Sequence, residues 1–356
     1  MSSFYRILSG AAALALFAIP SFGAAQEATI TYVRADIIAA ASEEAGAADP
    51  VQIVHARLAD GTEVRFEHIV VHNRADLLLS PGDRVILQHL TRADGTESFF
   101  LQEQYRLPWL GALLLCFLLL GMVVGGWRGC TSILGLAVSI AIIALVFFPL
   151  IVAGWSPLLV CGAGAFLIAL TTLYLSHGFN LRATLGVIAT AGTLLLTIGL
   201  GALAVSVTKL FGLGSEESVF LQSGMAEAMN LRGLLIGGII IGALGVLDDV
   251  TMAQIAAVDE VHKADRLAGW RSLYRAGISV GREHVASMIN TLALAYIGAS
   301  LPLFLLFSLN EDVPLWVTIN SAFIAEEVVR TIVGSIGLLL AIPIATWLAA
   351  RTYARR

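Results

Sequence analysis

Seven apolar stretches occupy the last two thirds of the chain and alternate with short polar connections. They span residues 108–126, 132–153, 157–175, 183–207, 231–247, 285–308 and 324–350. Most of them approach the roughly 20 residues that an α-helix needs to cross the hydrocarbon core of a bilayer. The pattern therefore predicts an α-helical polytopic membrane bundle of about seven spans over residues 108–350.

The composition supports this prediction. Of the 356 residues, 58% are hydrophobic and 13% are charged, with a formal net charge of −5, and the mean hydropathy is +0.85. Soluble domains carry about 25% charged residues, so the composition excludes an ordinary soluble protein. The chain is not basic enough to suggest a nucleic-acid partner. None of the three cysteines lies in the polar N-terminal region, so no disulfide framework is expected there.

The first 25 residues have the pattern of a secretory signal peptide. Arg6 precedes an apolar run over residues 7–19, and small residues follow up to Ala25. The run is too short for a comfortable spanning helix, although a retained membrane anchor is the alternative interpretation. Both interpretations place residues 26–107 outside the cytoplasm.

Residues 26–107 alternate apolar and polar positions in short runs, which is typical of β-strands. Turn signals separate about five such runs: Asp60-Gly61, Pro81-Gly82 and Asp94-Gly95. We predict a small extracytoplasmic β-barrel that resembles an OB-fold. His68 and His72 share one face of a predicted strand. Without a third ligand they are interpreted as a surface pair, and no metal site is predicted.

The cations indicate how the bundle is oriented. If the β domain is outside, the inner connections contain Arg128, Arg182, a basic block at residues 263–282 and the tail at residues 351–356. The outer connections are acidic. This distribution follows the positive-inside rule and agrees with the signal peptide. We therefore expect the N-terminal domain outside and a cytoplasmic basic tail.

The fifth apolar stretch combines glycines with carboxylates. In a helix, Gly238, Gly242, Gly245 and Asp249 follow at i, i+4, i+7 and i+11, so they share one face. A glycine face allows another helix to approach closely within a bilayer, which predicts a packing seam that presents Asp249. A carboxylate at the edge of a membrane helix is a candidate functional group. The alternative, a plain helix end in water, applies more to Asp248.

The last two apolar stretches also carry polar groups. Glu326 and Glu327 lie four and three residues before Arg330, so either glutamate can meet the arginine on one helix. One arginine neutralises one carboxylate, and an unpaired charge at mid-bilayer costs roughly 2.5–3.5 kcal/mol. The second carboxylate must take a proton, face an ion or pair with another helix; the alternative is an ion-paired anchor at the outer interface. Asn290 is expected to hydrogen-bond across helices, and Pro302 to kink its span.

Three blocks of the sequence resemble the signature blocks of the YibE/F family of bacterial multi-pass membrane proteins. They are GALGVLDDVTMAQIAAVDE, GREHVASMINTLALAYIGASLPL and FIAEEVVRTIVGSIGLLLAIPIA. In the first block Asp249, Val250, Met252 and Glu260 match the family pattern, whereas Asp248 stands where the family has an apolar residue. The resemblance covers about residues 29–350. It implies an exported β domain and permease-like spans in the bacterial cytoplasmic (inner) membrane, but it implies no activity.

These features favour an ion- or proton-coupled transporter of a small solute. The predicted pathway residues are Asp249, Glu260, Asn290, Glu326, Glu327 and Arg330, with Asp249 toward the inner end and the two glutamates toward the outer end. The expected partners are the lipid bilayer and an unknown small solute or ion, and a homo-oligomer is compatible with the sequence. No cofactor is expected.

Two other functions are weighed against transport. The first is a membrane scaffold whose β domain binds a partner outside the cytoplasm. The second is an intramembrane hydrolase, because the pair Glu326-Glu327 before Arg330 resembles the EExxxR motif of the CAAX-type glutamyl membrane proteases. Here only two residues separate the glutamate pair from the arginine, so we do not expect an enzyme. The sequence also contains no Walker motif for ATP-driven transport.

Overall fold

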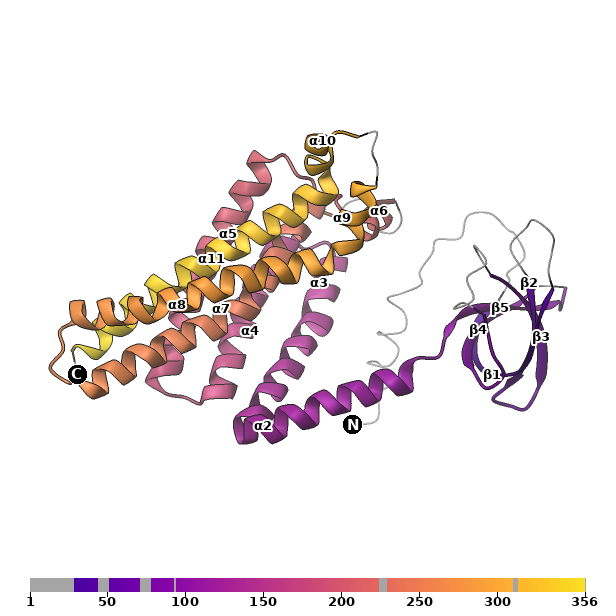
Figure 1. Cartoon of the computed structure of the whole chain (residues 1–356), viewed down its shortest axis with the longest axis horizontal. Coiled ribbons are helices and arrows are strands. Elements are labelled where there is room, and N and C mark those ends of the chain that lie inside the picture. Colours follow the sequence, from indigo (N-terminus) through magenta and orange to yellow (C-terminus); the bar gives the residue numbers. More distant parts are fainter. Residues whose placement is uncertain are drawn as a thin grey trace. The chain divides into compact units, whose positions relative to one another are not determined.

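The computed structural model describes residues 29–43, 51–70, 78–92, 94–223, 229–309 and 313–355. The chain divides into two compact units, residues 1–119 and 120–356 (Figure 1). The predicted signal peptide at residues 1–25 lies outside the described residues, as does His72 of the histidine pair.

The N-terminal unit contains an antiparallel five-stranded sheet with the strand order β3-β2-β1-β4-β5. Its strands are β1 (Thr29–Glu43), β2 (Val51–Leu58), β3 (Glu63–Ile69), β4 (Arg84–Thr91) and β5 (Glu97–Gln104). The hairpins β2–β3 and β4–β5 confirm the turn signals. Gly61 has φ 89° and Gly95 has φ 79°, a backbone conformation that glycine adopts without steric cost.

The sheet is curved around its longest strand. β1 pairs with β4 through its N-terminal half and with β2 through its C-terminal half. The pairing register shifts between Ile37 and Ala39, and such an irregularity bends a strand. Inward-facing residues, including Val54, Phe66 and Leu87, form an apolar core. The sheet is thus an antiparallel half-barrel, and its closure into an OB-like barrel stays a prediction.

Helices make up the rest of the described chain. They are α2 (Leu107–Ile142), the π-helix η3 (Ile143–Phe147), α3 (Phe148–Val152), α4 (Pro157–His177), α5 (Leu181–Val207), α6 (Glu216–Ser223), α7 (Leu231–Ala264), α8 (Trp270–Ala299), α9 (Leu301–Ser308), α10 (Leu315–Ile319) and α11 (Ala322–Tyr353). Asparagines start two of the long helices. The side chains of Asn180 and Asn230 accept hydrogen bonds from the backbone N–H groups of Ala183 and Gly233, as N-caps do.

The number of spans differs from the prediction. Among the described residues, five helical segments are long and apolar enough to cross a membrane: Leu107–Val152, Pro157–His177, Leu181–Val207, Leu231–Ala264 and Ala322–Tyr353. The first contains two predicted stretches, which Gly126 separates with the non-helical angles φ 55° and ψ −138°. The sixth predicted stretch is divided at Ser300, where α8 ends and α9 begins with Pro302 in its first turn. The count of seven is therefore not confirmed.

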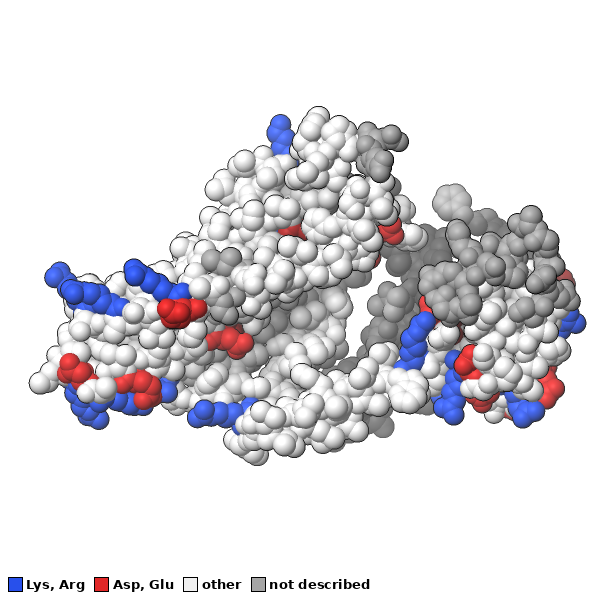
Figure 2. Space-filling model, viewed as in Figure 1, with Lys and Arg blue, Asp and Glu red and all other residues white. Residues whose placement is uncertain are grey.

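The surface of the helical unit is mostly apolar. Val123 is 80% exposed, Leu159 is 68% exposed and Leu203 is 61% exposed. Figure 2 shows little charge over the middle of this unit, and most of its Lys and Arg near the end where α7 leads into α8. Soluble proteins rarely expose large contiguous apolar patches, so this surface is consistent with contact with a lipid bilayer.

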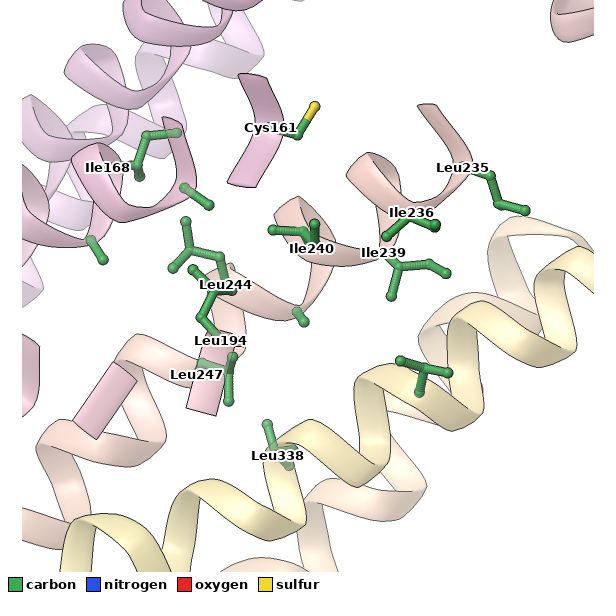
Figure 3. Close-up of a cluster of buried hydrophobic side chains, with 14 of the residues drawn as sticks. Cys161, Ile168, Leu194, Leu235, Ile236, Ile239, Ile240, Leu244, Leu247 and Leu338 are labelled. Atoms are coloured by element: carbon green, nitrogen blue, oxygen red, sulfur yellow. The ribbon is translucent and has the colours of Figure 1, made fainter. Parts of the chain in front are cut away.

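Helix α7 is the central helix of the unit, because it packs against α4, α5, α8 and α11. Its Leu244 lies in one buried cluster with Leu194 of α5 and Leu338 of α11 (Figure 3). Glycine permits the closest approach to α4, since a Cβ atom at Gly237 would lie 2.6 Å from the Sγ atom of Cys161. Polar side chains on the buried face of α7 therefore lie inside the bundle.

Candidate functional site

A partly buried aspartate lies at the centre of the candidate site. Asp248 extends from α7 toward α4, and its Oδ2 atom accepts a hydrogen bond of 3.2 Å from the Thr172 hydroxyl. Thr190 of α5 also interacts with this carboxylate. The Oδ1 atom of Asp248 is buried and has no hydrogen-bond partner among the described residues. Because a buried oxygen without a partner is costly, this atom marks a position suited to a proton or an ion.

Threonines of α5 and α7 extend the polar cluster. Thr251 lies one turn after Asp248 on α7, and its hydroxyl oxygen lies 2.9 Å from that of Thr190. Both threonine side chains are fully buried. Thr193 and Thr197, further along α5, instead donate to carbonyl groups of their own helix at 2.9 Å. Thr190 is therefore the hydroxyl of this α5 series that turns toward α7.

Two adjoining cavities connect the polar cluster with the end of the bundle. The first has a volume of about 370 Å³, and Asp248 is part of its lining. The second has a volume of about 390 Å³, and Arg182 is part of its lining. Both cavities are lined by Ser176, His177 and Asp249. Together they form a passage from the basic end of the bundle to Asp248, with a mixed lining at that end and a mostly apolar lining beside Asp248.

Asp249 lies where the two cavities adjoin. Its side chain is exposed, and its carboxylate interacts electrostatically with His177. The sequence favoured Asp249 over Asp248, but the structure places Asp248 deeper in the passage. The signal that could have identified Asp248 is the set of hydroxyl side chains in the third and fourth apolar stretches. These hydroxyls become informative only when the helices are assembled, because their partners are distant in the sequence.

The predicted glycine seam requires a correction. Gly238, Gly242 and Gly245 do share one face of α7, but that face is exposed. A Cβ atom at Gly238 or Gly245 would meet no atom within 4 Å, whereas one at Gly242 would lie 2.7 Å from the Oη atom of Tyr296. The prediction is therefore wrong for Gly238 and Gly245 within this chain. The physical reason is that α7 buries the adjacent face, which contains Gly237.

Glu326 holds a loop at the other end of the helical unit. Its side chain is buried, with 4% relative exposure, and its Oε1 atom accepts a hydrogen bond of 3.0 Å from the Gly214 backbone N–H. The backbone groups of Gly212 and Leu213 also interact with this carboxylate. The loop between α5 and α6 thus surrounds Glu326. The sequence did not predict that backbone N–H groups would bind Glu326, because backbone donors have no sequence signature.

Glu327 is the glutamate that pairs with Arg330. The Arg330 Nη1 atom lies 2.9 Å from Glu327 Oε1, and 18% of the Glu327 side chain is exposed. Tyr296 of α8 interacts electrostatically with both groups. Neither Glu326 nor Glu327 is part of the lining of the two cavities. The predicted pathway residues therefore occupy separate locations, and they do not form one cluster.

Glu327→Gln is expected to lower the free energy of unfolding by about 2 kcal/mol, because it leaves the Arg330 charge without its partner. The double variant Glu327→Gln, Arg330→Gln removes both charges and should recover most of this loss. Thermal melts of the purified protein in detergent measure both effects. Glu326→Gln is the control, since its main partner is the loop backbone. An equal rescue of Glu326→Gln by Arg330→Gln would contradict these partner assignments.

The two remaining predicted residues lie outside the passage. Glu260 accepts hydrogen bonds from Arg182 at 2.8 Å and from Lys263 at 2.9 Å. Asp259 binds the same two cations, so the four residues form an ion cluster that joins α5 to α7. Asn290 has an exposed side chain on α8, and no bond from it to another helix is found in the part of the chain described. Glu260 therefore has a structural role in this ion cluster, whereas the predicted interhelical bond of Asn290 is not seen among the described residues.

Comparison with known proteins identifies one family. The family model described as YibE/F-like protein matches residues 113–355. No curated protein matches the chain, and no solved structure matches it. The family match begins after the β sheet, so it includes all the candidate residues of the helical unit but not the N-terminal domain.

Proposed function

The chain belongs to the YibE/F-like protein family, and we propose that it is a membrane transporter that couples a small solute to the movement of a proton or another ion. Asp248 carries the proposal. This carboxylate has an oxygen without a hydrogen-bond partner in the described chain, and it lines a partly open cavity between apolar helices. An ionisable group at membrane depth is costly and usually functional.

The passage offers a route for the coupling ion. Asp249 and His177 line both cavities between the end of the bundle and Asp248. A cation would meet the Asp249 carboxylate first and the Asp248 carboxylate second. At the other end of the unit, Glu326 holds the loop between α5 and α6 against α11. The passage is open at the end near His177, whereas the loop between α5 and α6 is hydrogen-bonded to Glu326 at the other end. This difference between the two ends supports an alternating-access cycle, in which the two ends open in turn.

The test of the proposal uses liposomes that contain the purified protein and trapped dyes for pH and for Na⁺. Solutes are added as mixtures of one chemical class each, such as amino acids, sugars, phosphate or divalent metal salts. We expect at least one class to induce ion movement above that of protein-free liposomes. If correctly folded protein responds to no class, the transport proposal fails.

The second candidate function is a scaffold that binds a partner through the β domain. It is supported by a cavity of about 190 Å³, which is lined by charged and aromatic residues: Arg34, Asp36, Arg84 and Tyr105. A closed OB-like barrel would display such a cavity on a rigid surface. An enzymatic role is less well supported, because Glu326 is engaged by the loop backbone and Glu327 by Arg330. Failure of every solute class in liposomes would favour the scaffold.

The proposed orientation has the β domain outside the cytoplasmic membrane of a bacterium and the C-terminus inside. It is supported by the basic residues near the end of α7 and the start of α8. With the native cysteines replaced, Ala59→Cys should react with an impermeant thiol reagent in intact cells. Leu267→Cys, which is at a 96% exposed position, should react only after lysis. The reverse labelling pattern would overturn the orientation.

A further inference from the structure

We propose that Asp248, together with the hydroxyl groups of Thr172 and Thr190, binds one Na⁺ ion. This inference rests on the proposed function, for which it names the coupling ion. The three residues belong to α7, α4 and α5, so an ion bound among them would hold three helices together. Their side chains offer only oxygen atoms, which are the donors that hard cations prefer.

The hydroxyl hydrogens have acceptors other than the carboxylate. The Thr172 hydroxyl lies 2.8 Å from the carbonyl oxygen of Ile168, which is closer than the 3.2 Å to Asp248 Oδ2. The Thr251 hydroxyl donates to the backbone carbonyl of Asp248 at 3.0 Å. The Thr190 hydroxyl can in turn donate to Thr251 at 2.9 Å. With an ion bound, the Thr172 hydrogen would turn from Asp248 to the Ile168 carbonyl, and the lone pairs of Thr172 and Thr190 would then face the ion.

The charge of the site selects a monovalent cation. Asp248 is the one carboxylate that contacts the threonine cluster in the described chain. Asp248 balances only one charge of a divalent ion, because the neighbouring Asp249 carboxylate is exposed and contacts none of the threonines in the described chain; uncompensated charge at a partly buried site is costly. No group of three or more His, Cys, Asp or Glu residues suited to a metal ion is present in the described ranges, so sites typical of zinc or calcium are absent there.

The number of oxygen donors favours Na⁺ over a proton. A protonated carboxyl needs one acceptor, whereas this cluster brings oxygen atoms from three helices together around Asp248. The adjoining cavity of about 370 Å³ has room for water molecules that complete the coordination. Asp249 at the junction of the cavities supplies a negative charge along the route of entry.

The experiment measures the melting temperature of the purified full-length protein in NaCl, in KCl and in choline chloride, at equal ionic strength and pH. A ligand that binds only the folded state raises the melting temperature as its concentration rises. We expect such a saturable rise with Na⁺ and not with choline. Asp248→Asn should abolish the rise. Thr172→Val should weaken the apparent Na⁺ affinity about tenfold, because it removes one interaction with the charged ion.

Thr193→Val is the matched control. It makes the same chemical change at a fully buried position of α5, but the Thr193 hydroxyl bonds to its own helix, so the Na⁺ response should persist. The inference is overturned if choline and Na⁺ act alike, or if Asp248→Asn retains the Na⁺ response. A Na⁺ response without solute-dependent ion movement in liposomes would uphold the site and overturn the transport proposal. Proton-coupled solute movement without a Na⁺ response would uphold the transport proposal and overturn the Na⁺ site.

Discussion

Asp248→Asn is expected to reduce solute-dependent ion movement in liposomes to the background of protein-free liposomes. The substitution keeps the shape of the side chain and its ability to accept the Thr172 hydrogen bond. It removes the negative charge, which is what a coupling ion or proton recognises in an apolar bundle. The protein should still elute as a folded species on size exclusion, since no steric change occurs in the core.

A matched control separates coupling from general charge effects. Asp265→Asn makes the same chemical change at an exposed position just after α7, where the Asp265 carboxylate accepts a bond from the Leu267 backbone. This variant should transport like the wild-type protein. Full activity of Asp248→Asn would show that transport does not need the Asp248 carboxylate, and would contradict the transport proposal as stated.

Gly212→Ala is expected to destabilise the fold by about 3 kcal/mol, the largest loss of stability that we predict for a single small substitution. Gly212 has φ 80°, and an added Cβ atom would lie 2.2 Å from the carbonyl oxygen of Leu231. No side-chain rotation can relieve the unfavourable φ angle or the collision of the Cβ atom, because both involve the backbone. The loop that surrounds Glu326 must then move. Thermal melts in detergent measure the loss.

Gly238→Ala provides the comparison for this prediction. A Cβ atom at Gly238 would meet no atom within 4 Å, and alanine favours a helix by roughly 0.5–1 kcal/mol relative to glycine. This variant should melt at or slightly above the wild-type temperature. If Gly212→Ala melted like Gly238→Ala, the described position of the loop between α5 and α6 would be wrong.

The sequence was informative where the signals are local. The two Asp-Gly hairpins depend on a few adjacent residues, and both form as predicted. The break at Gly126 separates the first two apolar stretches as the sequence pattern suggests. The pairing of one glutamate with Arg330 also follows from spacing on one helix, and the structure selects Glu327. Local geometry determines each of these features.

The sequence was less informative where contacts join distant helices. Helical spacing placed Gly238 and Gly245 on one face, but spacing cannot tell which face of α7 meets its neighbours. The ranking of Asp248 below Asp249 failed to anticipate the hydroxyls that α4 and α5 bring to it. The partner of Glu326 is a backbone N–H group, which every residue except proline possesses. No pattern of side chains could have indicated it.

The contact between Glu326 and the loop also limits how this protein can evolve. Backbone groups supply the partners of Glu326, so the identity of the Leu213 side chain matters little to the contact. Gly212 and Gly214 are constrained by space, since a Cβ atom at Gly214 would lie 2.5 Å from the Glu326 carboxyl carbon. Saturation mutagenesis should therefore find position 213 tolerant of every residue except proline, between two positions that accept only glycine.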